Sequence, residues 1–161
     1  MIDLIHKFII PAAYLLLPAN MSSDESTAML LAIGLQESRL KYREQIGGPA
    51  HGFWQFEKGG GIIGVLTHPS SRPHLLNVLS SLQYRLDISP DDLYHTITHN
   101  DILAASCARL LLWTDFRPMP KFNDGPEAAW KIYNSVWRPG KPHMESWDAF
   151  HSEAWKKVKE L

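Results

Sequence analysis

A glutamate near the end of an apolar segment is the residue of this 161-residue chain best suited to acid–base chemistry. Glu37 lies in the last turn of the segment Ala28–Arg39, and a stretch rich in glycine and aromatic residues follows at 47–57. Burial disfavours a charged carboxyl group, and so does the negative end of a helix dipole, so both effects raise the pKa of Glu37. An acid kept protonated near neutral pH can protonate a departing oxygen, such as that of a glycosidic bond. The alternative is a solvated acid that pairs with Lys41 one helical turn later.

The helix that carries Glu37 has its own start signal. Ser22 and Glu25 form a capping-box pattern, which predicts a helix that begins at Ser22 and ends at about Arg39. Its residues 28–35 are apolar on every side. This pattern predicts a helix buried at the centre of the molecule.

Most of the remaining chain shows helical signals. An amphipathic helix is expected at the start, its apolar face formed by Leu4, Ile5, Phe8, Ile9, Ala12 and Leu15 or Leu16. Further helices are expected over 73–86, after caps at Ser89 and Asp124, over 102–113 after Asn100 or Asp101, and over 144–159. The stretch 47–57 predicts short strands and turns that continue loosely through 59–65. The sequence thus predicts an α+β, predominantly helical fold with a small irregular β patch, as a single domain over 1–161.

Three short motifs follow one another along the chain: Glu37-Ser38, Gly52-Phe53-Trp54-Gln55 and Tyr133-Asn134. Together with the helix start Asn100–Ala105 they resemble the lysozyme-like lytic transglycosylase family. In that family a Glu-Ser pair ends a central helix, a Gly-x-x-Gln strand forms the cleft wall and a Tyr-Asn pair lies near the C-terminus. The resemblance covers roughly residues 28–139 and looks most like small phage or prophage wall-degrading proteins. It implies a lysozyme-like fold with the β patch at the cleft.

The resemblance also implies roles for individual residues. Glu37 would be the single catalytic acid and base at the β-1,4 bond between N-acetylmuramic acid and N-acetylglucosamine. Ser38 would orient the substrate or the carboxylate, and Gln55 would hydrogen-bond a sugar in the cleft. Tyr133 would bond Glu37 and fix its rotamer, while Asn134 would hold the local backbone. The implied partner is a peptidoglycan glycan strand in the bacterial cell wall, bound by a monomer without cofactor or metal.

A second catalytic carboxylate is missing from its usual place. Animal lysozymes carry one just before the Gly-x-x-Gln motif, where this chain reads Ala50-His51. Its absence favours a mechanism in which the muramic 6-hydroxyl closes a 1,6-anhydro ring. Glu57 is the nearest spare acid, and it leaves open a muramidase that hydrolyses the same bond with water. A non-catalytic wall-binding or structural phage component is the third reading, against which the intact Glu37, Gln55 and Tyr133 argue.

Other chemistry-bearing residues have plainer interpretations. His51 lies in the cleft segment and is the histidine expected to touch substrate. His95 and His99 have the spacing of helical zinc ligands, but no Glu follows His95 as in metalloproteases. Cys107 lies in an apolar helix and is expected to be buried. The glycines at 59–64 are expected to form a loop that edges the cleft, and residues 137–143 either line distant sugar subsites or form a surface loop.

Composition excludes several classes of function. Lysines and arginines total 16 against 17 acids, so the chain lacks the basic character of a nucleic-acid binder. One cysteine excludes an internal disulfide framework. The apolar stretch 8–17 is too short to span a bilayer and has weak signal-peptide features, so no stable membrane insertion is expected and the export route is open. Of six tryptophans, Trp54 and Trp137 are expected at the cleft, and Trp113, Trp130, Trp147 and Trp155 in the core.

Overall fold

The computed structural model describes residues 1–160 and is predominantly helical. The first half of the chain forms α1 (Ile2–Leu4), the π-helical η1 (Ile5–Ile9), α2 (Ile10–Leu15), the 3-10 turn η2 (Ala19–Met21), α3 (Asp24–Ser38), the π-helical η3 (Lys58–Ile62), α4 (Ile63–Thr67) and α5 (Arg72–Ser81). The second half forms α6 (Pro90–His99), α7 (Asp101–Trp113), the 3-10 turn η4 (Phe122–Asp124), α8 (Gly125–Trp137) and α9 (Met144–Lys159).

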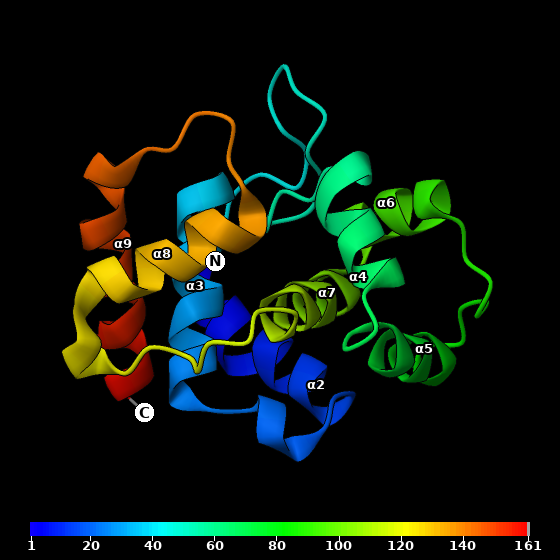
Figure 1. Cartoon of the computed structure of the whole chain (residues 1–161), viewed down its shortest axis with the longest axis horizontal. Helices are drawn as coiled ribbons and strands as arrows, with labels where there is room; N and C mark the ends of the chain where they lie inside the picture. Colours follow the sequence, from blue (N-terminus) through cyan, green and yellow to red (C-terminus); the bar gives the residue numbers. More distant parts are fainter. Residues whose placement is uncertain (161) are drawn as a thin grey trace.

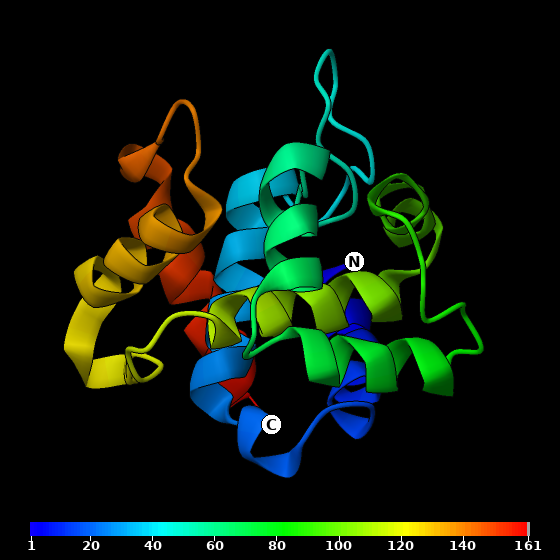
Figure 2. The ribbon, with the colours of Figure 1, turned by 45° about the vertical axis from the view of Figure 1, so that its right-hand side comes forward.

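The helix α3 lies at the centre of the molecule, as its apolar sequence predicts. Every residue from 28 to 35 is buried. Figures 1 and 2 show α8 and α9 on one side of α3, and α4, α5 and α6 on the other, with α7 crossing between them. The end of α3 therefore lies between two groups of helices.

The start of α3 is one residue later than predicted. Ser23, not Ser22, is the cap: its hydroxyl accepts a 3.1 Å hydrogen bond from the Ser26 amide, and the Ser26 hydroxyl accepts one from the Ser23 amide at 3.1 Å. Ser26 takes the place expected for Glu25 because it is fully buried and its short hydroxyl also donates to the Met21 carbonyl. A glutamate at this buried position would lose its hydration.

The N-terminal helix forms as predicted, but its buried face is different. The residues that pack into the core include Ile5, Ile10 and Ala13, whereas Leu4, Phe8 and Leu15 are exposed. Residues 5–9 form a π-helical turn, which holds more residues per turn than an α-helix. The regular α-helical spacing therefore does not identify the face that meets the core.

The predicted strands are absent from residues 1–160, and two isolated antiparallel bridges stand in their place, Glu44 with His51 and His51 with Phe56. The Gly-x-x-Gln motif is a tight turn between them. Gly52 and Gln55 both have left-handed backbone, with φ of 75° and 52°. The alternation of a strand fails here because Phe53, Trp54 and Phe56 are all buried, on both sides of the expected alternation.

The glycine-rich segment 59–65 is helical, not a loop or a strand. It forms η3 and the start of α4, and it lies directly on Phe56 and Leu111. A Cβ atom on Gly61 would lie 2.6 Å from the Phe56 ring and 3.2 Å from a Leu111 methyl group. Gly61 and Gly64 therefore serve close helix packing rather than a flexible turn.

Among the later helices, α7 and α9 have the predicted bounds, and Ser89 and Asn100 cap α6 and α7 as predicted. The helix α5 ends at Ser81 rather than 86, because the left-handed Gln83 turns the chain and the Tyr84 amide bonds back to the Leu79 carbonyl at 2.8 Å. Asp124 precedes α8 as predicted, but its carboxylate accepts from the Lys121 amide and does not cap α8.

Candidate active site

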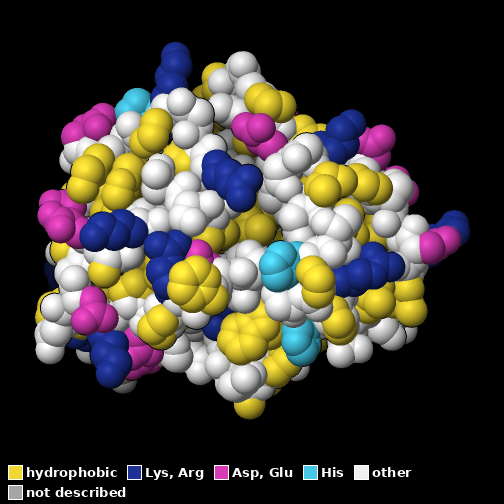
Figure 3. Space-filling view, viewed as in Figure 1, with side chains coloured by type: hydrophobic (Ala, Val, Ile, Leu, Met, Phe, Trp, Pro, Cys, Tyr) yellow, Lys and Arg dark blue, Asp and Glu magenta, His cyan; other side chains and the backbone are white. Residues whose placement is uncertain are grey.

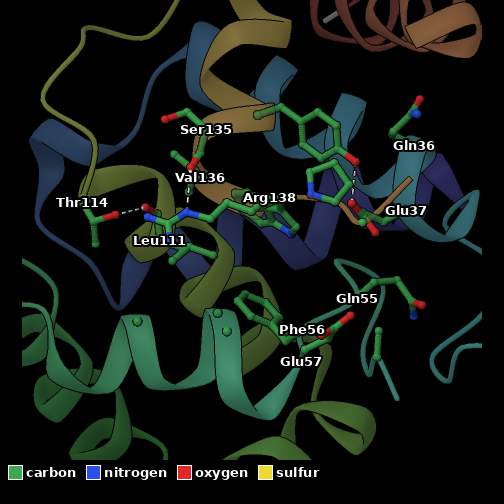
Figure 4. A pocket seen from close by; sticks show the side chains of 18 of the residues that line it. Gln36, Glu37, Gln55, Phe56, Glu57, Leu111, Thr114, Ser135, Val136 and Arg138 are labelled. Carbon is green, nitrogen blue, oxygen red and sulfur yellow. Dashed lines mark hydrogen bonds between the residues drawn. The ribbon is translucent and has the colours of Figure 1, made fainter. Parts of the chain in front are cut away.

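A cavity of about 1220 Å³ opens at the end of α3. Its walls come from the end of α3, the turn at residues 50–57, the helices η3 and α4, the end of α7, and α8 with the segment 138–143 that follows it. Figure 3 shows that this face of the molecule is hollowed near its middle. Figure 4 shows side chains from these separate elements directed toward one another around the hollow.

Glu37 lines this cavity and is partly buried. Burial is the main cause that raises the pKa of its carboxyl group to about 7, and the nearby charge of Glu57 raises it further. The hydrogen bond from Tyr133 and the charge of Arg39 oppose this shift. The direction that the sequence predicts is confirmed: burial raises the pKa of this carboxyl group well above its ordinary value.

Tyr133 fixes the Glu37 side chain. Its hydroxyl donates a 2.6 Å hydrogen bond to Glu37 Oε1, and Figure 4 shows this bond at the edge of the cavity. The Tyr133 ring stacks on Trp147, with 5.0 Å between ring centres and 8° between planes. Glu37 Oε2 accepts no hydrogen bond from residues 1–160, so this oxygen is available for a proton or a ligand. Tyr133 thus takes the place beside Glu37 that the family resemblance implies.

Two further residues of the predicted site region also line the cavity. Gln55 does so from the tight turn, and its side-chain amide donates to the Gly52 carbonyl at 2.9 Å. Glu57 lies in the same wall, two residues later. Three acidic residues therefore line the cavity: Glu37, Glu57 and Asp115.

Three predicted site residues lie outside the cavity wall. The Ser38 hydroxyl is buried and donates to the Phe53 carbonyl at 2.6 Å, so it ties α3 to the turn and does not reach a substrate. His51 stacks on the Tyr94 ring at 3.9 Å between centres, and its Nδ1 bonds the Thr98 hydroxyl at 2.8 Å. Asn134 is exposed on α8, and its carbonyl accepts from the Arg138 amide. The expected contacts of Ser38 and His51 with substrate are therefore not supported by their positions.

The tryptophans divide differently from the prediction. Trp54 is fully buried, and its indole donates to the Leu30 carbonyl at 2.8 Å, so it is part of the core and presents no face to a sugar. Trp137 does line the cavity, and its indole donates to the Trp54 carbonyl at 2.8 Å. The side chains expected in the core do pack there: Trp113, Trp130, Trp147 and Trp155.

Sequence patterns did not indicate Gln36, which the structure shows to be important for the geometry of the site. Its amide nitrogen donates to the His143 carbonyl at 2.9 Å, and its amide oxygen accepts from the Ser146 hydroxyl at 3.0 Å. These bonds join the residue next to Glu37 to the start of α9. The segment 138–143 is consequently held at the cavity, which favours the lining interpretation of this segment over a plain surface loop.

Comparison of the chain with family models, with curated proteins and with solved structures found no match.

Other residues that could bind a metal or act as a nucleophile are not arranged for either role in the described part of the chain. Among the described residues, no three His, Cys, Asp or Glu side chains converge as they would around a metal ion. His95 lies edge-on to the rings of His51 and Tyr94. Cys107 is fully buried, as predicted, and burial raises the pKa of its thiol to about 12, which makes it a poor nucleophile. Within residues 1–160, each helix is too short or too polar to cross a bilayer.

Proposed function

We propose that this chain has a lysozyme-like fold and cleaves the β-1,4 bond between N-acetylmuramic acid and N-acetylglucosamine in peptidoglycan, as a lytic transglycosylase. The observation that carries the proposal is the state of Glu37. It is a carboxyl group with a pKa raised to about 7, held by Tyr133 at one oxygen and without a partner at the other, in the wall of a large cavity. This is the arrangement that a general acid requires.

The reaction needs a single acid and base. Glu37 donates its proton to the glycosidic oxygen as the bond from that oxygen to the muramic C1 breaks, and positive charge develops on the sugar. The resulting Glu37 carboxylate stabilises this charge and then removes the proton from the muramic 6-hydroxyl. The 6-oxygen bonds C1 and closes the 1,6-anhydro ring, and Glu37 is again protonated. No water is consumed.

The other acids of the cavity support this assignment. The Asp115 carboxylate is engaged by the Arg117 guanidinium, with nitrogen–oxygen distances of 2.9 and 2.6 Å, so it is not free to act as a base. Ala50 lines the cavity where a second catalytic acid would be expected from the motif order. Glu57 remains, and its charge raises the pKa of Glu37, so it assists the acid without making a bond to it.

A muramidase that hydrolyses the same bond is the second candidate, and Glu57 is the observation that favours it. Glu57 lines the same cavity as Glu37 and could hold a water molecule for attack at C1. The two candidates differ in product, because the transglycosylase product is lighter by one water and has no reducing end.

Digestion of purified sacculi tests the function, with products identified by mass spectrometry. Wild-type protein should release anhydro-muropeptides, and Glu37→Gln should release none while it keeps the wild-type circular dichroism spectrum. Glu127→Gln, an exposed acid on α8 away from the cavity, is the matched control and should retain full activity. Products with reducing ends would establish the muramidase. No cleavage by the wild type between pH 4 and pH 8, together with retention on sacculi, would establish a non-catalytic wall-binding component.

A further inference from the structure

Two arginines end helices in the same unusual backbone conformation. Arg39 follows α3 and Arg138 follows α8, and both are left-handed, with φ of 58° and 49°. Glycine is the usual residue at this position because a Cβ atom makes the left-handed conformation unfavourable. An arginine at such a position is therefore expected to make an interaction that offsets this cost.

Arg39 makes this interaction within its own helix. Its guanidinium donates to the Leu35 and Gln36 carbonyls at 2.9 and 2.8 Å, and it lies 4.5 Å from the centre of the Phe150 ring. The charge thus caps the negative end of α3. Arg39 accordingly has a structural role.

Arg138 has no equivalent partners. Its Nε donates one long hydrogen bond of 3.4 Å to the Ser135 carbonyl, and its two terminal nitrogens donate to none of residues 1–160. No carboxylate of the described chain lies within 4.0 Å of this guanidinium. Arg138 lines the cavity, and in Figure 4 its side chain extends from the end of α8 toward Leu111 and Thr114, away from Glu37.

A second cation without an ion-pair partner in residues 1–160 lines the same cavity as Arg138. Lys141, three residues later, also lines the cavity and makes no ion pair with the described residues. Asp115 is the acid that lines the cavity beside Thr114, and it is neutralised by Arg117. Two cations without ion-pair partners in the described chain therefore border the same cavity as the acids Glu37 and Glu57, and the free Arg138 guanidinium would attract an anionic group of a bound ligand.

We propose that Arg138, supported by Lys141, forms a subsite for a carboxylate on the peptide stem of the substrate. This inference rests on the proposed function. In a stem-bearing strand the sugars at the scissile bond carry no charge, because the lactyl carboxyl group of the muramic unit is tied up in the amide bond to the stem, whereas the stem itself carries carboxylates. A guanidinium with both terminal nitrogens free binds a carboxylate through two parallel hydrogen bonds. The substrate class is thereby narrowed to glycan strands that bear peptide stems.

The test compares glycan strands that carry stems with the same strands after an amidase has removed the stems and the lactyl carboxyl groups freed by that cleavage have been converted to neutral methylamides. Arg138→Gly removes the charge and also the Cβ atom that makes the left-handed backbone unfavourable. The variant should therefore melt at the same temperature as the wild type or at a higher one. Its cleavage rate should fall about tenfold on stem-bearing strands and less than twofold on stem-free strands, since the lost bonds are charge-assisted. Arg138→Lys should restore part of the difference. Lys131→Ala, an exposed cation on the same helix but outside the cavity wall, should behave as wild type on both substrates.

The outcomes separate the two proposals. Cleavage of stem-free strands by the wild type tests the proposed function alone. If the wild type cleaves neither substrate, both the proposed function and this inference are wrong. Suppose that the wild type cleaves both substrates, and that Arg138→Gly either lowers the cleavage rate equally on both or lowers it on neither. The stem subsite is then wrong, while the proposed function stands. Added salt should reduce the wild-type preference for stem-bearing strands, and a preference that is insensitive to salt would also contradict the inference.

Discussion

The Tyr133 hydroxyl donates a 2.6 Å hydrogen bond to Oε1 of Glu37, across 96 positions of the sequence. The donor and the acceptor lie on different helices, α8 and α3, so the bond exists only in the folded chain. It stabilises the carboxylate form and thus keeps the pKa of Glu37 lower than burial alone would set it. One interaction thereby orients the acid and tunes its proton affinity.

Tyr133→Phe should separate these two effects. Loss of the hydrogen bond raises the pKa of Glu37 above about 7, so the high-pH limb of the rate profile, where the acid loses its proton, should move to higher pH. The maximal rate should fall because the carboxyl group is no longer fixed. The pH dependence of sacculus cleavage measures both, with Tyr42→Phe, an exposed tyrosine without a side-chain hydrogen bond, as the control. A profile that moves to lower pH would contradict this account of Tyr133.

Glu37 should make the stability of the wild type depend on pH. Its pKa is raised from 4.5 to about 7 in the folded chain, so its stabilising contribution is fully present below pH 4.5 and is lost as the pH rises to about 7. Gln keeps the acceptor for Tyr133 but carries no charge. The free energy of unfolding of Glu37→Gln, measured by urea titration, should therefore exceed that of the wild type by about 3 kcal/mol at pH 8, and the excess should vanish near pH 4. An excess that is the same at pH 4 and pH 8 would show that the folded pKa is not raised.

The glycines of the segment 59–61 should differ sharply in how well they tolerate substitution by alanine. Gly61→Ala would bring a Cβ atom within 2.6 Å of the Phe56 ring and should lower the free energy of unfolding by about 1–3 kcal/mol. Gly59→Ala meets no atom within 4 Å and should be neutral or slightly stabilising, since alanine favours the helix. Thermal unfolding of the pair checks the prediction. Equal melting temperatures would mean that η3 does not pack on Phe56 as described.

Arg109 is a buried cation that makes no ion pair with the described residues. Its Nη1 has no hydrogen-bond partner, and burial lowers the pKa of its guanidinium. Its Nε donates to the Met21 carbonyl, but that carbonyl also accepts from the Ser26 hydroxyl and would stay satisfied. Arg109→Met should therefore be neutral or raise the free energy of unfolding by about 1–2 kcal/mol in urea titrations. A loss of several kcal/mol would show that the guanidinium has a partner such as a bound anion.

The sequence predicts those helices whose position depends only on residues close together in the chain. The central helix α3 and the helices α7 and α9 follow from apolar patterns and from caps such as Asn100, because burial and capping act within a few residues. The raised pKa of Glu37 follows from the same local pattern. Its pairing with Tyr133 does not, since no periodicity relates residues so far apart, and it was expected only from the resemblance of the motifs.

The remaining features depend on packing between distant segments. The burial of Trp54 results from a turn that directs two consecutive aromatic side chains inward, which contradicts the alternation of a strand. The bonds of Gln36 join α3 to the start of α9, and a glutamine in an apolar helix carries no signal for such a partner. The glycines at 59–61 indicate flexibility by composition, whereas in the structure Gly61 allows η3 to approach Phe56 and Leu111 closely.

The bonds from Gln36 to His143 and Ser146 also have a consequence for the order in which the protein is made. The ribosome synthesises α3 early, yet Glu37 gains its tyrosine only when α8 has emerged, and its neighbour Gln36 is fixed only by the first turn of α9. A nascent chain therefore carries the acid long before it carries the site. The arrangement around Glu37 can therefore form only after the first turn of α9 has been synthesised, 107 to 110 positions beyond Gln36.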